Sequence, residues 1–216
     1  MAREKNTDIM VDRLLQAAGI EARAEISGVK EIDEALKTAS KRGTGHIGSP
    51  EFLAVVDGFV LAVEDKRDTD FHVALLDDGS LDMSLKAVTD YAVNGGVHYG
   101  QHIATNTPFK KVFAIGVSGD EKHHVIQPAF CDGDTVRVLE PVETFTNFNE
   151  HNIGAFYDEQ VCGIKADREI ELEEIVKLAK ELHEDLRDYA QLGETEKPIV
   201  VSALLLALQD PSFSLD

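Results

Sequence analysis

The chain has 216 residues, a net charge of −19 and 43% hydrophobic residues, enough for one good core with a helical appendage. No apolar run approaches the roughly 20 residues of a membrane-spanning helix, and the charged start MAREKNTD lacks a signal peptide's apolar stretch. The sequence therefore predicts a cytoplasmic protein with no membrane partner. Cys131 and Cys162 stand far apart without Cys-x-x-Cys spacing, which argues against a structural zinc site.

Hydrophobic periodicity predicts two helices in the first part of the chain. Residues 9–18 carry an apolar stripe that Gly19 ends, and residues 32–41 carry a second one. The strings EFLAVV and FVLAVEDK follow, separated only by Asp57 and Gly58. They predict two strands joined by a two-residue turn.

A longer helix and three further strands are expected next. Residues 85–104 have a helical pattern despite Gly95 and Gly96, and KKVFAIGV, HHVIQPAF and TVRVLE are strand-like. We therefore expect an α/β domain over residues 1–140, with a mixed sheet of about five strands flanked by helices.

The pattern changes after residue 140. The polar connection VETFTNFNEHN leads to a helical stripe formed by Ile175, Leu178, Ala179, Leu182 and Leu186. Pro198 then introduces IVVSALLLAL, which is apolar almost all round and must be buried against something. Residues 141–216 are therefore expected to form a helical segment leading into a further domain, and the end at DPSFSLD indicates a piece of a longer protein.

The predicted hairpin fixes which residues face one another. A two-residue turn at Asp57-Gly58 makes residues whose numbers sum to 115 cross-strand partners, and Glu51 and Glu64 are such a pair. Because side chains alternate between the faces of a strand, Lys66 shares their face, with the two acidic Cβ atoms roughly 5 Å apart. Asp65 is expected to point to the opposite face.

Two opposed carboxylates repel unless a cation lies between them or one is protonated. A divalent metal satisfies this pair economically, and oxygen ligands suit Mg²⁺. Lys66 could then hold or activate a water molecule and stabilise charge on a phosphate under attack. The alternative is a solvated charge cluster at the strand ends.

These residues also match a known motif. The string SPEF followed by VEDK resembles the PD-(D/E)xK nuclease motif, with Pro50-Glu51 as its first element and Glu64-Asp65-Lys66 as its second. The stretch from EIDEALKTASKRGTGHIGSPEF to AVEDK is similar to the nuclease portion of restriction-modification proteins fused to an N6-adenine DNA methyltransferase, of type IIG and type I-like enzymes. The tail, KELHEDLRDYAQLGETEKPIVVSALLLAL, is similar to the helical segment before the methyltransferase.

The resemblance implies a restriction-endonuclease-like fold and Mg²⁺-dependent hydrolysis of DNA, with Mn²⁺ as a substitute. It places Glu51, Glu64 and the main-chain carbonyl of Asp65 near the metal, with Lys66 as the catalytic lysine. A helix acid can join such a metal shell, which makes Glu34 the favoured candidate and Glu31 its alternative. A Gln or Tyr on the helix after the ExK strand is also seen in such nucleases, which points to Gln101 and Tyr99.

The implied partners are double-stranded DNA and methyltransferase and specificity domains in the same or a partner chain. A homodimer is one way to cut both strands. S-adenosylmethionine would serve only the methyltransferase, whose Asn/Asp-Pro-Pro-Tyr/Phe motif is absent from these residues.

The charge leaves a second function open, because phosphate contacts depend on clustered Lys and Arg. Acidic residues crowd the stretch 167–196, whereas several basic residues lie near the proposed site: Lys37, Lys41, Arg42, Lys66 and Arg67. The alternative is a non-catalytic module that retains the nuclease fold for DNA docking or subunit assembly.

Two other sequence patterns, a glycine-rich loop and a pair of histidines, are weaker indications of function. Gly43–Gly48 matches the G-x-G-x-x-G dinucleotide fingerprint, but a helix precedes it and a strand follows, the reverse of the required order. His98 and His102 stand four apart without the further ligands that a zinc site needs, so they are expected to be polar surface residues.

Overall fold

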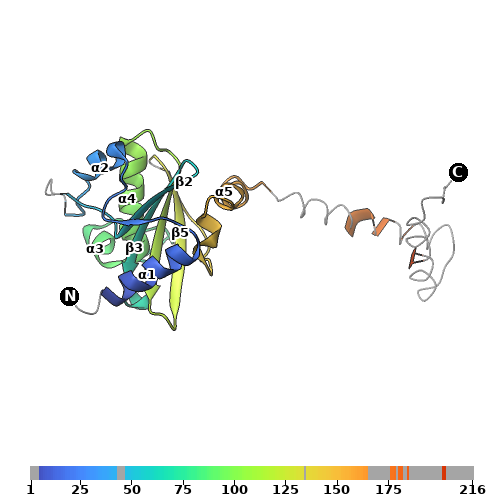
Figure 1. Cartoon of the computed structure of the whole chain (residues 1–216). Coiled ribbons are helices and arrows are strands. Elements are labelled where there is room, and N and C mark those ends of the chain that lie inside the picture. Colours follow the sequence, from blue (N-terminus) through green and yellow to red (C-terminus); the bar gives the residue numbers. More distant parts are fainter. Residues whose placement is uncertain are drawn as a thin grey trace. The chain divides into compact units, whose positions relative to one another are not determined.

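The computed structural model describes residues 5–42, 47–133 and 135–164, together with residues 176–178, 180, 181, 184, 201 and 202. The chain divides into two units, Met1–Ile164 and Lys165–Asp216 (Figure 1). The predicted helical stripe after residue 175 and the apolar stretch after Pro198 lie largely outside the described residues.

The first unit contains the elements that position the candidate site. Its strands are β1 (Arg23–Ala24), β2 (Phe52–Val56), β3 (Phe59–Lys66), β4 (Val112–Gly119), β5 (His124–Asp132) and β6 (Thr135–Val138). Its α-helices are α1 (Lys5–Ala17), α2 (Lys30–Leu36), α3 (Leu85–Asp90), α4 (Ala92–Asn106) and α5 (Ile153–Gln160). Two short 3₁₀ helices complete it, η1 (Thr69–Phe71) and η2 (Phe145–Phe148).

The strands form one six-stranded sheet in the order β1-β2-β3-β4-β5-β6. All neighbours are antiparallel except β3 and β4, which are parallel and are connected through η1, α3 and α4. A parallel pair needs such a crossover, because the chain must return to the same end of the sheet. This mixed, helix-flanked sheet is the architecture expected from the sequence, and it is compatible with a restriction-endonuclease-like fold.

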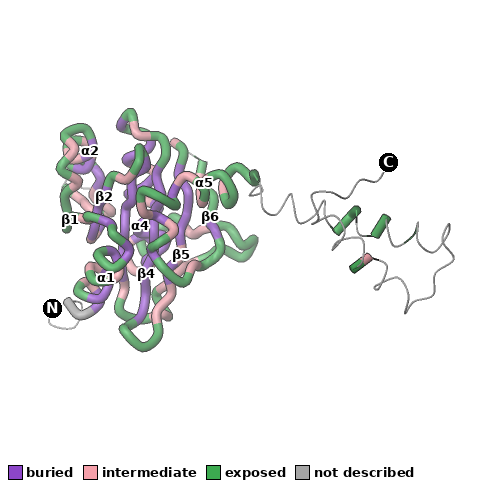
Figure 2. Tube along the Cα trace, turned by 45° about the vertical axis from the view of Figure 1, so that its right-hand side comes forward, coloured by how far each residue is buried: buried purple, intermediate pink, exposed green. Residues whose placement is uncertain are grey.

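Each face of the sheet has its own core. On one face α1, η2 and α5 pack against residues such as Leu61 and Val63. On the other face α2 and α4 pack against residues such as Val60 and Ala62 (Figure 1). Figure 2 shows the central strands buried along almost their whole length. Their continuous apolar sequences reflect this burial on both faces.

The hairpin has the register expected from the sequence. Asp57 and Gly58 both have positive φ angles, 47° and 80°, and Val56 pairs with Phe59. Positive φ at both central residues is the mark of a type I′ turn, whose twist matches that of the flanking strands.

Three elements differ from the expectation. The helix expected over 85–104 is interrupted at Tyr91, whose extended backbone ends α3 and begins α4. The helix expected over 32–41 ends at Leu36, after which Lys37, Thr38 and Ala39 donate to carbonyls three residues back. A sixth strand, the two-residue β1, extends the sheet beyond β2.

The folded unit also extends past the boundary expected at residue 140. Phe145, Phe148 and Ile153 are buried in the core with Phe113, and the rings of Phe113 and Phe148 lie 5.4 Å apart. The polar residues between these side chains made the segment resemble a linker. Among the described residues, no helix combines the length and apolar character needed to cross a membrane.

The turn that sets the register can be tested by substitution. Gly58→Ala should lower the free energy of unfolding by about 1–2 kcal/mol, because a side chain at this positive φ is strained. No neighbouring atom lies within 4 Å of the added Cβ, so the cost is conformational. Urea denaturation measures it.

Gly154→Ala is the matched control, because Gly154 is in α5 and its added Cβ also meets open space. This control should be neutral or stabilise the fold by less than about 1 kcal/mol. Equal effects at the two positions would contradict the argument from the turn.

Candidate functional site

The proposed site lies where β3 ends and β2 begins. Along β3, Val60 and Ala62 belong to the core on the α2 and α4 face, so by alternation Glu64 and Lys66 point to that same face. Glu64 is only 2% exposed, although it is a carboxylate. A buried carboxylate needs cations or hydrogen-bond donors around it, which makes this the chemically unusual point of the sheet.

Glu51 is brought close to Glu64 by the hairpin register. The β2–β3 ladder ends at Phe52 and Val63, and the next residues along it are Glu51 and Glu64. Burial, and after it the negative charge of Glu64, raises the pKa of the Glu51 carboxyl. Both effects are those expected for two acids close together in a partly buried site.

Two lysines neutralise Glu64 at a single oxygen. Lys41 Nζ donates to Glu64 Oε1 in a short ion pair, and Lys66 Nζ lies 3.3 Å from the same oxygen. The Lys41 ammonium also lies 4.9 Å from the centre of the Tyr99 ring, within the range of a cation–π interaction. From the sequence, Lys41 was only one of several basic residues near the site, so its direct contact with Glu64 was missed.

The close packing of α4 against this pair depends on Gly95. A Cβ added at Gly95 would lie 2.9 Å from Lys41 Nζ and 3.1 Å from Glu64 Cγ, closer than packed atoms normally approach. The glycine therefore allows the helix to approach Lys41 and Glu64.

The histidines of α4 hold the segment that carries Lys41. His98 Nε2 lies 2.8 Å from the carbonyl oxygen of Ala39, and His102 Nε2 lies 2.9 Å from that of Ala35. Each imidazole is half-buried and bonded to main chain, so the two are packing residues rather than the surface residues expected. The part of the chain that the structure describes contains no group of three or more His, Cys, Asp or Glu side chains placed to hold a metal.

Asp65 points to the opposite face, as alternation requires. It is 7% exposed, and its Oδ2 is buried without a hydrogen-bond partner among the described residues. Burial, and after it the charge of Asp8, raises the pKa of Asp65 to about 8. Asp8 lies on α1, and its charge also raises the pKa of Glu51; no sequence pattern singled it out.

The main-chain carbonyl of Asp65 faces the β2 side of β3. Val60 N–H donates to Lys111 O beside β4, so by alternation Ala62, Glu64 and Lys66 direct their backbone groups toward β4 and Asp65 directs its own toward β2. Continued past its last pair, Phe52 and Val63, the hairpin register would place Pro50 across from Asp65, and proline has no N–H to donate. Pro50 therefore cannot donate a hydrogen bond to the Asp65 carbonyl oxygen.

The remaining predicted residues lie in different surroundings. Glu34 is exposed on α2 and pairs with Lys37 at 2.7 Å, which lowers its pKa. Glu31 is exposed on the same helix. Gln101 is half-buried on α4, two residues after the buried Tyr99. Of the glycine loop, only Ile47 and Gly48 are described.

A second polar network adjoins Lys66 on β4. Ser118, the register partner of Lys66, is fully buried and its Oγ lies 2.8 Å from His72 Nδ1. His72 Nε2 lies 3.0 Å from Gln127 Oε1, and burial lowers the pKa of this imidazole. A neutral His72 can donate to Gln127 and accept from Ser118, which secures the segment leaving β3.

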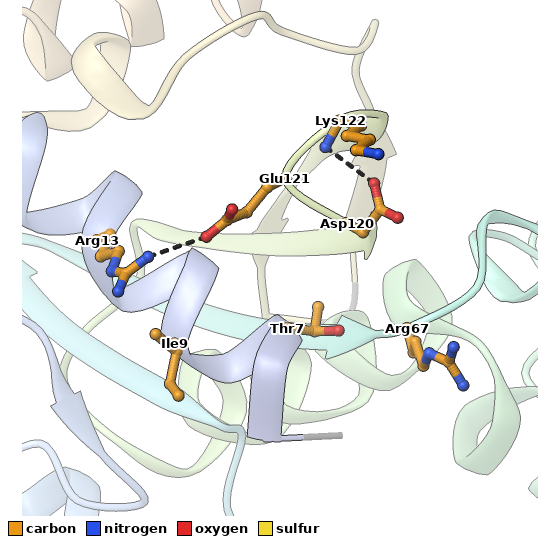
Figure 3. A pocket seen from close by; sticks show the side chains of 7 residues that line it. All are labelled: Thr7, Ile9, Arg13, Arg67, Asp120, Glu121 and Lys122. Carbon is orange, nitrogen blue, oxygen red and sulfur yellow. Dashed lines mark hydrogen bonds and ion pairs between the residues drawn. The ribbon is translucent and has the colours of Figure 1, made fainter. Parts of the chain in front are cut away.

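A pocket lies on the Asp65 side of the sheet end. Figure 3 shows it between α1, the residue after β3 and the β4–β5 loop. It is lined by Thr7, Ile9, Arg13, Arg67, Asp120, Glu121 and Lys122. Because Arg13 pairs with Glu121 at 2.9 Å and both are largely exposed, the pocket is a mixed-charge surface, separate from the Glu51–Glu64 pair.

The buried Asp65 predicts a pH-dependent stability. Its raised pKa means that the folded chain holds a proton between about pH 4 and pH 8 that the unfolded chain has released. The free energy of unfolding should therefore fall as the pH rises through this window. Asp65→Asn should remove this pH dependence. At pH 8 its free energy of unfolding should exceed that of the natural chain by on the order of a few kcal/mol.

Urea denaturation at pH 5 and pH 8 without divalent metal measures this effect. Asp77→Asn is the control, because Asp77 is exposed in a loop. If the natural chain and Asp65→Asn lost stability in parallel, the buried, protonated Asp65 would be refuted.

Comparison with known proteins gives one informative match. Over 219 aligned residues, the chain is 38% identical to a protein of Heyndrickxia coagulans named type II restriction enzyme and methyltransferase RM.BcgI. The alignment includes all of this chain but spans only 34% of that relative, about a third of its length. No protein-family model and no solved structure matches the chain. The chain is therefore similar to one part of a protein named for both restriction and methylation.

Proposed function

We propose that this chain carries the DNA-cleaving site of a restriction-modification protein. The observation that carries the proposal is the buried Glu64 at the end of β3, with Lys66 on the same face of that strand and Glu51 near enough for its carboxyl to feel the charge of Glu64. The similarity to a protein named as a restriction enzyme and methyltransferase supports the same function.

The residues present fit a hard divalent metal ion. Glu51 and Glu64 would supply carboxylate oxygens, and the Asp65 carbonyl, which is directed toward β2 and receives no N–H from Pro50, would supply a third ligand. Mg²⁺ binds through few protein oxygens and keeps several waters, so this ligand set is sufficient, and Mn²⁺ would substitute. When bound, such an ion polarises a phosphate oxygen and lowers the pKa of a bound water.

Lys66 is proposed as the catalytic lysine. Its ammonium is 3.3 Å from Glu64 Oε1, and its side chain is 25% exposed, so it is close to the proposed metal ligand and still partly open to solvent. From there it would orient the attacking water and stabilise negative charge on the phosphate. Hydrolysis adds this water across one phosphodiester bond and leaves a phosphate on one side of the break and a hydroxyl on the other.

The substrate and the partner domains are proposed from the similarity to the restriction enzyme and methyltransferase. Double-stranded DNA is the substrate, and a methyltransferase domain that uses S-adenosylmethionine, with a specificity domain, would lie in the same or a partner chain. A homodimer would supply two such sites, one for each strand.

The deciding experiment is Mg²⁺-dependent cleavage of plasmid DNA by the full-length protein. Lys66→Ala and Glu64→Gln should each lower the cleavage rate by about 100-fold or more, because each removes a group that acts on the reacting phosphate or its metal. Lys37→Ala and Glu34→Gln are the matched controls, because these residues form an exposed pair on the same side of the sheet.

Unchanged cleavage in the two site variants would refute the nuclease assignment. Loss of cleavage in Glu34→Gln, with Lys37→Ala still active, would instead place Glu34 in the metal shell.

Two observations favour a second function, a non-catalytic module for DNA docking or subunit assembly. Glu64 is already neutralised by two lysines, and the chain as a whole carries a charge of −19. Such a module needs no metal at Glu51 and Glu64. Calorimetric titration with Mn²⁺ separates the two functions, since only the nuclease site predicts saturable binding that Glu64→Gln abolishes.

A further inference from the structure

The contact between Lys41 and Glu64 adds a residue to the proposed site. We propose that Lys41 is a positioning residue, which fixes the Glu64 carboxylate so that one oxygen stays with the lysines and the other is presented to the metal. This inference rests on the proposed function, because it assigns a role toward the metal held by Glu51 and Glu64.

The first argument is the way the two oxygens of Glu64 are used. Lys41 and Lys66 both contact Oε1. The other oxygen, Oε2, is the one that a metal shared with Glu51 would take. A carboxylate bound in this way loses the freedom to rotate, and hydrogen-bonded partners of this kind orient a ligating carboxylate for its metal.

The second argument is that the position of Lys41 is built by several independent contacts. Its ammonium lies over the ring of Tyr99, and Gly95 leaves the space that it occupies. The chain just before it is held by the bond between His98 and Ala39 O. The Lys41 side chain is therefore only 14% exposed, unlike the 56% exposed Lys37 on the preceding turn.

The third argument distinguishes the roles of the two lysines. Lys66 is more exposed, at 25% of its side chain, and its contact with Oε1 is 3.3 Å. Lys41 is only 14% exposed and lies against Gly95 of α4 and Glu64. The geometry therefore suits Lys66 to contact with the phosphate and Lys41 to contact with the Glu64 carboxylate. Loss of Lys41 should lower the affinity for the metal rather than the rate of the chemical step.

The test is Lys41→Met in the full-length protein, because methionine keeps the apolar stem and removes the ammonium. Calorimetric titration with Ca²⁺ or Mn²⁺, without DNA, should show a metal affinity lowered about 10- to 100-fold. Lys37→Met is the matched control and should bind the metal as the natural protein does. Circular dichroism and thermal unfolding establish that both variants are folded.

Cleavage assays give a second readout that a merely structural role would not produce. Lys41→Met should need more Mg²⁺ for half-maximal cleavage but reach a rate near that of the natural protein at saturating Mg²⁺. Lys66→Ala should show the opposite split, with a low rate at every Mg²⁺ concentration.

The outcomes separate the inference from the function on which it rests. An unchanged metal affinity in Lys41→Met overturns the positioning role, and a raised affinity shows instead that Lys41 competes with the metal for Glu64. In both cases the nuclease assignment stands. Absence of metal binding in the natural protein overturns both.

Discussion

The burial of a single carboxylate, that of Glu64, determines how this end of the molecule is arranged. β3 is buried along both faces, so a carboxylate at its end must either be paired with cations or take up a proton. Two ammonium groups converge on one of its oxygens, and the glycine, histidines and tyrosine of α4 bring one of them there. The helix and the strand are thus connected through electrostatics as well as through apolar packing.

The two acids that follow one another on β3 have opposite surroundings. Glu64 is surrounded by cations, whereas Asp65 lies on the α1 face near Asp8 with a buried, unpartnered oxygen. Alternation alone separates them, but it also leaves the Asp65 main chain on the side of Glu51. The carbonyl of Asp65 is thus directed in the plane of the sheet toward β2, while its side chain lies on the α1 face, where burial favours the protonated acid.

The sequence predicted the parts of this arrangement that depend on local rules. The two-residue turn at Asp57-Gly58 fixed the pairing of β2 and β3, and with it the shared face of Glu64 and Lys66. Lys41 could not be predicted in the same way, because it is 23 residues from Glu64 and its position depends on how α4 packs. Asp8 was missed for the same reason. The core phenylalanines of η2 were missed because polar neighbours hid them in what resembled a linker.

The type I′ turn has a consequence for how the site could be lost. It lies seven residues from Glu64, roughly 20 Å along the strand at about 3.3 Å per residue. One residue inserted between β2 and β3 would shift the pairing of the hairpin by one position and carry Glu51 to the face of Asp65. Whether Glu51 and Glu64 share a face of the sheet therefore depends on the turn at the far end of the hairpin. A change in loop length there would separate them without altering any residue of the candidate site.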